Sequence, residues 1–348
     1  MSTDNVRLKS NNEEIDLVEL VRELWKGRVL ILSVMLMFLF CAVIYVYVKA
    51  PQYEAKATVR APSQEGIAAL NIGRGDKSGL RLLEAKDVYA VYLRNLQSES
   101  IRRKFFEDVY VPDLKAEGHE VGNDQSYRQF SNDARVENAD ANLSSRATIT
   151  LLAFQPQTAA YWVQLYSNLA AAQAVRQLIA DVQSDAKAKA EGLEQQIEID
   201  RDSARKQRED KIIQLKEALS IARAVGLEKP PFISASLASE LSSEISGGLA
   251  YMRGSKALEA EIAMFEARIS DDPYIPGLRQ KQADLSFYRK LSIDPAAVEV
   301  YQMDGEVKLP DRPAKPRIAL ILVAALVLGA LVGLVLVFVR KLLVEAKR

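Results

Sequence analysis

The sequence predicts an α+β membrane protein. Two transmembrane helices flank an α/β base domain, and a very long helix of about 100 Å and a helical hairpin project from that base. Two long apolar runs lie near the ends of the 348 residues. Alternating segments typical of strands follow the first run and precede the second. Between them, residues 158–225 contain no proline and one glycine, Gly192, as a continuous helix requires.

The two apolar runs are residues 29–48 (VLILSVMLMFLFCAVIYVYV) and 318–339 (IALILVAALVLGALVGLVLVFV), neither of which contains a charged side chain. Each has at least the ~20 residues that cross a hydrocarbon core. The first run is longer than the apolar part of a signal peptide and ends in Tyr45, Tyr47 and Lys49. We therefore expect an uncleaved anchor.

Lysines and arginines are balanced across each span, so local charge does not set the orientation. Short tails stay in the cytoplasm, whereas long domains translocate largely regardless of charge. We therefore expect residues 1–28 and 340–348 in the cytoplasm and the main domain to be exported, which in a bacterium would place it in the periplasm. Cys41, the only cysteine, lies inside the first span, so no disulfide is expected. The 46 acidic and 46 basic residues give no bulk electrostatic reason to bind nucleic acid.

The apolar spacing of residues 13–25, before the first span, is typical either of a helix on the inner membrane face, with Trp25 at the interface, or of a plain extension of the span.

The base domain is predicted over residues 49–157 and 292–317. Within it, alternation and turn residues predict a loop at 63–79, two short helices within 82–108 and a turn at 142–144. They also predict strands over 53–60, 134–136, 146–154 and 298–302, the last returning to the first.

The projection is predicted over residues 158–291. Its long helix, residues 158–225, begins with Thr158 as N-cap after Pro156, and its first part carries a broad apolar face. From Asp200 to Lys211 only Ala204 is apolar, which indicates either a solvated wall held by ion pairs or a hinge. Residues 226–254 turn the chain, and helices over 255–270 and 278–291 bring it back.

The sequence contains no recognisable enzyme signature. His119 is the only histidine, so the sequence has no HExxH motif and no histidine-based zinc site, and no Ser/His/Asp set is recognised in it. The glycine-rich run 73–79 lacks the order of a phosphate-binding P-loop, and Asp271-Asp272 precedes Pro273, where turn aspartates are common. We therefore predict a protein that is not an enzyme and that has no cofactor and no metal site.

Two motifs at the second span are candidate contact sites. Pro310, Pro313 and Pro316 recur every third residue, which is typical either of a stiff polyproline strut that transmits the position of the exported domain to the membrane, or of a simple linker. Ala325, Gly329 and Gly333 share one helical face, and small residues at this spacing allow close helix packing. We expect these six residues to contact a partner or another helix.

In several places the sequence resembles the Wzz family of chain-length determinants, the kinase-free polysaccharide co-polymerases. Residues 14–20 (EIDLVEL) are similar to the family's N-terminal signature, and 251–262 (YMRGSKALEAEI), continued by 271–274 (DDPY), resemble its internal block. The proline-rich entry to the second span, with Lys315 and the Gly329/Gly333 helix, resembles the family's C-terminal part. The resemblance covers nearly the whole chain.

The resemblance implies a ring- or bell-shaped homo-oligomer embedded in the lipid of the bacterial inner membrane, with its main domain in the periplasm. It would set the modal length of lipid-linked O antigen, the polysaccharide of lipopolysaccharide, as a scaffold for the polymerase Wzy. The alternative is a co-polymerase for capsule or exopolysaccharide that works with a separate kinase. Kinase-linked members have a cytoplasmic nucleotide-binding domain after the second span, whereas here nine residues follow Val339. A different class, a two-span sensor or chemoreceptor, would need a cytoplasmic signalling module, which we do not find in the sequence either.

Overall fold

The computed structural model describes residues 25, 27–118, 121–138, 146–231 and 248–345, the last five by their backbone alone. The helix predicted over residues 13–25 lies, apart from Trp25, outside the described residues, as do His119, the turn at 142–144 and most of the turn at 226–254. The chain forms two compact units. Unit 1 comprises residues 1–63, 85–174 and 300–348, and unit 2 comprises residues 64–84 and 175–299.

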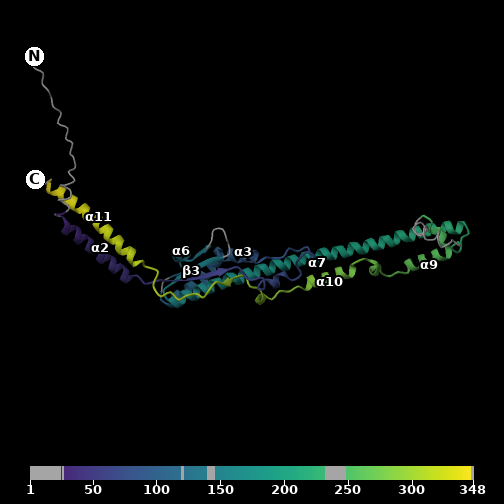
Figure 1. Cartoon of the computed structure of the whole chain (residues 1–348), viewed down its shortest axis with the longest axis horizontal. Coiled ribbons are helices and arrows are strands. Elements are labelled where there is room, and N and C mark those ends of the chain that lie inside the picture. The colour runs from purple at the N-terminus through teal and green to yellow at the C-terminus, as the bar shows by residue number, and fades with distance from the viewer. Residues whose placement is uncertain (1–24, 26, 119–120, 139–145, 232–247, 346–348) are drawn as a thin grey trace, which may run out of the picture. The chain divides into compact units, whose positions relative to one another are not determined.

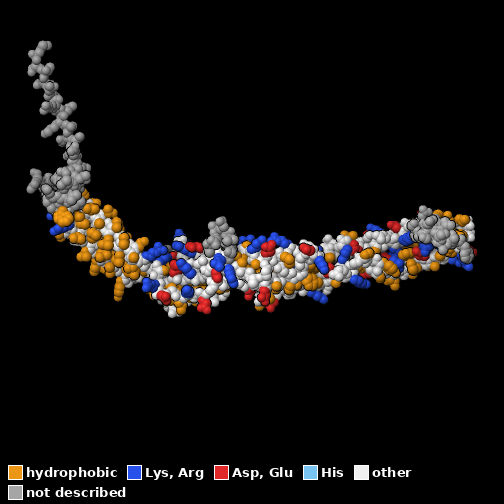
Figure 2. All heavy atoms as spheres, viewed as in Figure 1, with side chains coloured by type: hydrophobic (Ala, Val, Ile, Leu, Met, Phe, Trp, Pro, Cys, Tyr) orange, Lys and Arg blue, Asp and Glu red, His pale blue; other side chains and the backbone are white. Residues whose placement is uncertain are grey.

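The two apolar runs form the helices that were predicted from them. Helix α2 spans Arg28–Val48 and α11 spans Ile318–Glu345. By length and composition, Arg28–Val48 and Ile318–Arg340 qualify as candidate membrane spans. The two helices lie side by side, and hydrophobic side chains cover the face of the pair that Figure 2 shows (Figure 1, Figure 2). Such exposure suits contact with lipid.

The sheet of unit 1 has four antiparallel strands in the order β2-β3-β1-β4. Strands β1 (Tyr53–Arg60), β2 (Arg135–Asn138) and β3 (Arg146–Ala153) match the predicted segments within two residues. The predicted closing strand 298–302 is wrong in position, because β4 is Gln302–Met303. It does pair with β1, through Val59 and Arg60. Val298 and Val300 are buried outside the sheet, so their apolar alternation reflects packing rather than strand pairing.

Helices cover one face of this sheet. The two helices predicted within 82–108 are present as α3 (Ala85–Leu96) and α4 (Glu99–Phe105), and three further elements follow: the π-helical turn η2 (Phe106–Tyr110), α5 (Val111–Ala116) and α6 (Asp124–Asp133). Aromatic rings from α4, η2, α6 and the next helix, α7, meet in the core, where edge-to-face and stacked contacts join Phe105, Phe130, Tyr110 and Trp162. The indole nitrogen of Trp162 donates to Asp113 at 2.7 Å.

The long helix α7 runs without interruption from Pro156 to Ala224, a span of 69 residues. This confirms the prediction of one helix of about 100 Å at 1.5 Å per residue. The predicted N-cap, Thr158, is wrong, because the helix begins two residues earlier at Pro156. Proline suits the first turn of a helix, where its missing N–H would have had no partner within the helix.

Unit 2 consists of the later part of α7 and the chain that returns beside it (Figure 1). The returning elements are the 3₁₀ turn η3 (Ala250–Arg253), helix α9 (Ser255–Glu266), turn η4 (Asp272–Tyr274), helix α10 (Leu278–Lys290) and turn η5 (Pro295–Ala297). The predicted loop 63–79 contains a short 3₁₀ turn, η1 (Ala68–Asn71), whose Leu70 is fully buried.

Two apolar clusters hold α7 and the returning chain of unit 2 together. One is built from Leu215, Leu219 and Ala222 of α7 with Leu258 and Ile262 of α9. The other joins Ala186 and Ala190 of α7 to Tyr288 of α10. The polar segment Asp200–Lys211 lies between these clusters along α7.

Candidate functional site

The small residues of α11 lie against α2. A Cβ atom added to Gly329 would lie 2.8 Å from the Cα of Met35, and one added to Gly333 would lie 3.0 Å from the Cα of Ile31. Ala325, one turn earlier, is 8% exposed. The two helix backbones approach closely because these positions carry little or no side chain. The structure therefore brings both glycines of the predicted face onto the other span of the same chain, and Ala325 on the same face is buried.

The proline-rich segment before α11 is hydrogen-bonded to the chain that leaves α2. The backbone N–H of Ala314 donates to the carbonyl of Gln52 at 2.8 Å, and the N–H of Gln52 donates to the carbonyl of Lys315 at 2.9 Å. The ammonium group of Lys315 pairs with Asp133 of α6. The segment is thus fixed both to helix α6 and to the short connection between α2 and β1.

The three prolines do not share one environment. Bends occur at 311–312 and at Pro316, so the segment is not a uniform polyproline helix. Pro313 and Pro316 line a mostly apolar groove of about 390 Å³ at the ends of the two spans, together with Val46, Tyr47 and Leu322, whereas Pro310 does not line it. The structure therefore brings two of the three predicted prolines together.

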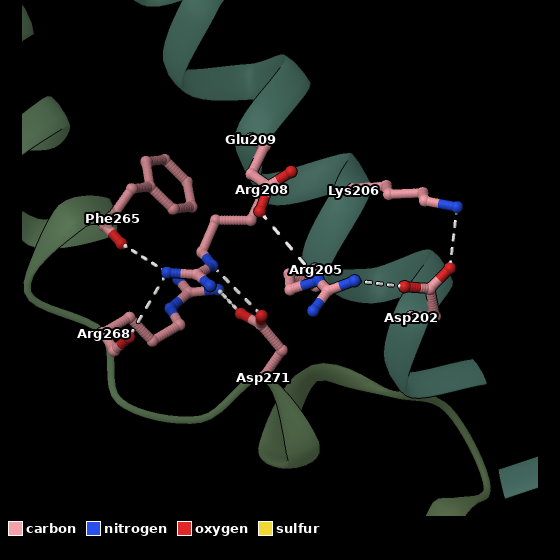
Figure 3. Close-up of polar contacts among 8 residues, drawn as sticks. All are labelled: Asp202, Arg205, Lys206, Arg208, Glu209, Phe265, Arg268 and Asp271. Atoms are coloured by element: carbon pink, nitrogen blue, oxygen red, sulfur yellow. Dashed lines mark hydrogen bonds and ion pairs between the residues drawn. The ribbon is translucent and has the colours of Figure 1, made fainter. Parts of the chain in front are cut away.

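Arg208 on α7 lies at the centre of a polar cluster, which we call the Arg208 cluster (Figure 3). Its Nε donates to Asp271 at 3.0 Å, and its Nη1 donates to the carbonyl oxygens of Phe265 and Arg268 at 3.2 and 3.3 Å. The side chains of Arg208 and Asp271 are 19% and 10% exposed. Because this guanidinium satisfies three acceptors at once, it fastens the returning chain to the middle of α7.

Two further ion pairs flank the Arg208 cluster. Arg201 donates two hydrogen bonds to the carboxylate of Asp272, at 2.9 and 2.7 Å, and Lys281 donates to Asp200 at 2.6 Å. The hydrogen bond from Lys281 lowers the pKa of Asp200, and the hydrogen bond from Arg201 lowers the pKa of Asp272. Both carboxyl groups are therefore ionised at neutral pH, as the pairing requires.

The outward side of the polar segment carries ion pairs within α7 itself. Asp202 accepts from Arg205 and Lys206, as Figure 3 shows, and these side chains are 40 to 67% exposed. Of the two alternatives predicted for Asp200–Lys211, the solvated wall held by ion pairs describes this outward side. The hinge is excluded because α7 continues through the segment without interruption. The inward side has partners that the sequence did not reveal. Asp271 and Asp272, predicted to be turn residues, serve that role and also bind arginines.

Among the described residues, no group of three or more His, Cys, Asp or Glu side chains is placed to hold a metal ion. What the geometry of these sites can do is join chain segments and fix a domain to two adjacent spans.

Comparisons with known proteins agree with this arrangement. A sequence profile described as "Wzz: Chain length determinant protein" matches residues 13–109. A chain length determinant protein of Escherichia coli O111:H- is 24% identical over 337 residues, 96% of this chain and 94% of that protein. One from Salmonella typhimurium strain LT2 is 23% identical over 328 residues, 92% of this chain and 90% of that protein.

Solved structures show the same fold. A full-length bacterial polysaccharide co-polymerase aligns with a TM-score of 0.68 at 20% identity, over 95% of this chain and 99% of that chain. The wild-type lipopolysaccharide O-antigen chain-length regulator of Shigella flexneri aligns with a TM-score of 0.54 at 15% identity, over 75% of this chain and 99% of that one. A Wzz dodecamer fitted to a cryo-EM map aligns with a TM-score of 0.51 at 16% identity, over 76% of this chain and 100% of that chain.

The fold is that of a full-length bacterial polysaccharide co-polymerase, and a candidate membrane span lies near each end of the chain. Within that fold, the sequence is similar to the Wzz chain length determinant proteins, through the profile match over residues 13–109 and through relatives that are 24% and 23% identical over 96% and 92% of this chain. The two candidate spans and the similarity to Wzz proteins support an inner-membrane protein with a periplasmic domain.

Proposed function

We propose that this protein sets the modal chain length of O antigen in lipopolysaccharide made by the Wzy-dependent pathway. In this proposal the protein is a non-catalytic homo-oligomeric scaffold for the polymerase Wzy, acting while the growing polysaccharide is lipid-linked. Both termini lie in the cytoplasm. The observation that carries the proposal is the match to chain length determinant proteins over 96% of this chain, both spans included.

The outer face of α7 supports self-association. Ile199 and Ile213 are 60% and 56% exposed, although each lies two residues from a buried neighbour, Ile197 and Leu215 respectively. Residues two apart on a helix point about 200° apart, so the exposed pair lies opposite the core of unit 2. Exposed isoleucines on a long helix suit burial against a second copy of the chain. A structurally similar Wzz protein is described as a dodecamer, which favours a second copy of the chain as the partner of this face.

Deleting the gene in its host and restoring it on a plasmid tests the function. We expect deletion to leave O antigen polymerised but with scattered lengths on a lipopolysaccharide gel, and the plasmid to restore a modal cluster of bands. Identical banding in all strains would contradict the proposal. If secreted capsule or exopolysaccharide changed in mass instead, the kinase-partnered alternative would replace it.

The prolines of the groove provide a more specific test. We propose that Pro313 and Pro316 fix the base domain to α11 as a stiff connection and thereby contribute to length control. The double variant Pro313→Ala/Pro316→Ala is expected to broaden the length distribution at an unchanged protein level, because alanine frees the backbone that proline restricts. Pro310→Ala, outside the groove, is the matched control. Wild-type banding from the double variant would reduce the segment to a linker.

A further inference from the structure

The face of the unit 1 sheet that the helices leave open is polar. Along β1, Ala55, Ala57 and Val59 are buried while Glu54 and Lys56, which alternate with them, point to the other side. On that other side a cavity of about 360 Å³ opens between β1, β2, β3 and residues 314–317. We call it the sheet basin.

The sheet basin lies at the membrane surface by chain connectivity. Arg317, which lines it, is followed directly by Ile318, the first residue of the second span. Lys315 also lines it, two residues further from the span. A basic side chain at the end of a span lies at the level of the lipid headgroups, whose phosphates are negatively charged. A ligand that reaches the basin from the membrane therefore presents its headgroup.

Most charges of the sheet basin neutralise each other, and two arginines are left over. Lys56 pairs with Glu54 at 2.8 Å, and Lys315 pairs with Asp133. Arg135 and Arg317 also line the basin, and among the described residues neither has a carboxylate partner. The remaining charged residues of the basin are the two arginines and one acid, Glu137, so positive charge is in excess.

We propose that the sheet basin binds the phosphate headgroup of an anionic membrane phospholipid, with Arg135 and Arg317 donating hydrogen bonds to the phosphate oxygens. The planar fork of a guanidinium matches a phosphate with two parallel N–H donors. Thr150, the uncharged polar residue that lines the sheet basin, also offers a hydroxyl group. The bound lipid would hold the sheet to the membrane surface, a role independent of the chain-length function proposed above.

The test measures phosphatidylglycerol retained by the full-length protein after reconstitution in phosphatidylcholine nanodiscs that contain it, with bound lipid counted by native mass spectrometry. The double variant Arg135→Gln/Arg317→Gln is expected to retain about tenfold less, since one charged hydrogen bond is worth roughly that factor. The matched control is Arg60→Gln/Arg146→Gln. It removes the same charge from two arginines that face each other across β1 and β3, outside the basin.

Retention that falls in the basin variant and persists in the control supports the proposal, provided that both variants keep the wild-type mass and thermal unfolding temperature. Equal retention in all three proteins, or an equal loss in both variants, overturns it. In a separate arm, soluble glycerol phosphate is added to the lipid-loaded protein. Complete displacement of the lipid at an equal concentration would show that the site takes a free phosphate ester, and the lipid assignment would be wrong.

Discussion

Gly329 lies where the backbones of the two spans approach closely. Any side chain at this position must displace the backbone of α2, since a Cβ would lie 2.8 Å from the Cα of Met35. We expect Gly329→Leu to destabilise the α2–α11 pair by about 1 to 3 kcal/mol, as overpacking does elsewhere. The measurement is thermal unfolding of the purified protein in detergent. Ala324→Leu, on an exposed position of α11, is the control and is expected to change little.

The small-residue pattern on α11 predicts close packing without identifying the helix that packs there. Ala325, Gly329 and Gly333 would look the same if they faced a polymerase, a second copy or the first span. In the structure Gly329 faces Met35 and Gly333 faces Ile31 of α2. Which helix packs against such a motif depends on how the spans are arranged in three dimensions. No local pattern in the sequence encodes that arrangement.

At the scale of elements, Arg208 makes more hydrogen bonds to the returning chain than any other arginine of the polar segment of α7. Replacing Arg208 by methionine would remove one donor each from the Asp271 carboxylate and from the carbonyl oxygens of Phe265 and Arg268. Asp271 would keep a hydrogen bond from Arg268 at 3.4 Å. We expect Arg208→Met to lower the free energy of unfolding by about 2 to 3 kcal/mol, because it removes a partly buried ion pair and two further hydrogen bonds from a charged group. Chemical denaturation monitored by circular dichroism measures this loss.

Arg205→Met is the matched control for that prediction. Arg205 lies on the same segment of α7, but its side chain is 58% exposed and its partner, Asp202, belongs to the same helix. Exposed pairs of this kind contribute about 0 to 1 kcal/mol. Equal losses in the two variants would mean that the Arg208 cluster does not hold the returning chain.

Local patterns predicted the elements of the chain more completely than their partners. Helix α7, strands β1 and β3, and both spans could be predicted because their composition and periodicity extend over eight or more residues. Strand β4 was misplaced because two residues carry too little pattern. The role of Asp200–Lys211 stayed open because its partners, Asp271 and Asp272, lie more than 60 residues away in the sequence.

At the scale of the whole molecule, the exposed isoleucines of α7 should decide the oligomeric state. We expect Ile199→Asp/Ile213→Asp to shift the purified protein towards smaller assemblies, because a buried carboxylate without a partner opposes association. Mass photometry in detergent measures the change. Ile72→Asp, at another exposed position of unit 2, should leave the mass unaltered. An unchanged mass distribution in the double variant would place the contact between copies on another surface.

The polar segment of α7 also has a geometric consequence. Ile197 and Leu215 lie on its two sides and are both buried, and their 18-residue separation is five full turns at 3.6 residues per turn. The helix therefore returns to the same rotational phase after the segment. A deletion of two residues would rotate everything beyond it by about 200° and turn Leu215 away from α9, whereas removing seven would change the phase by only about 20°. Natural variation in the length of this helix is therefore expected in steps of 7, 11 or 18 residues, matched by similar steps in the returning chain.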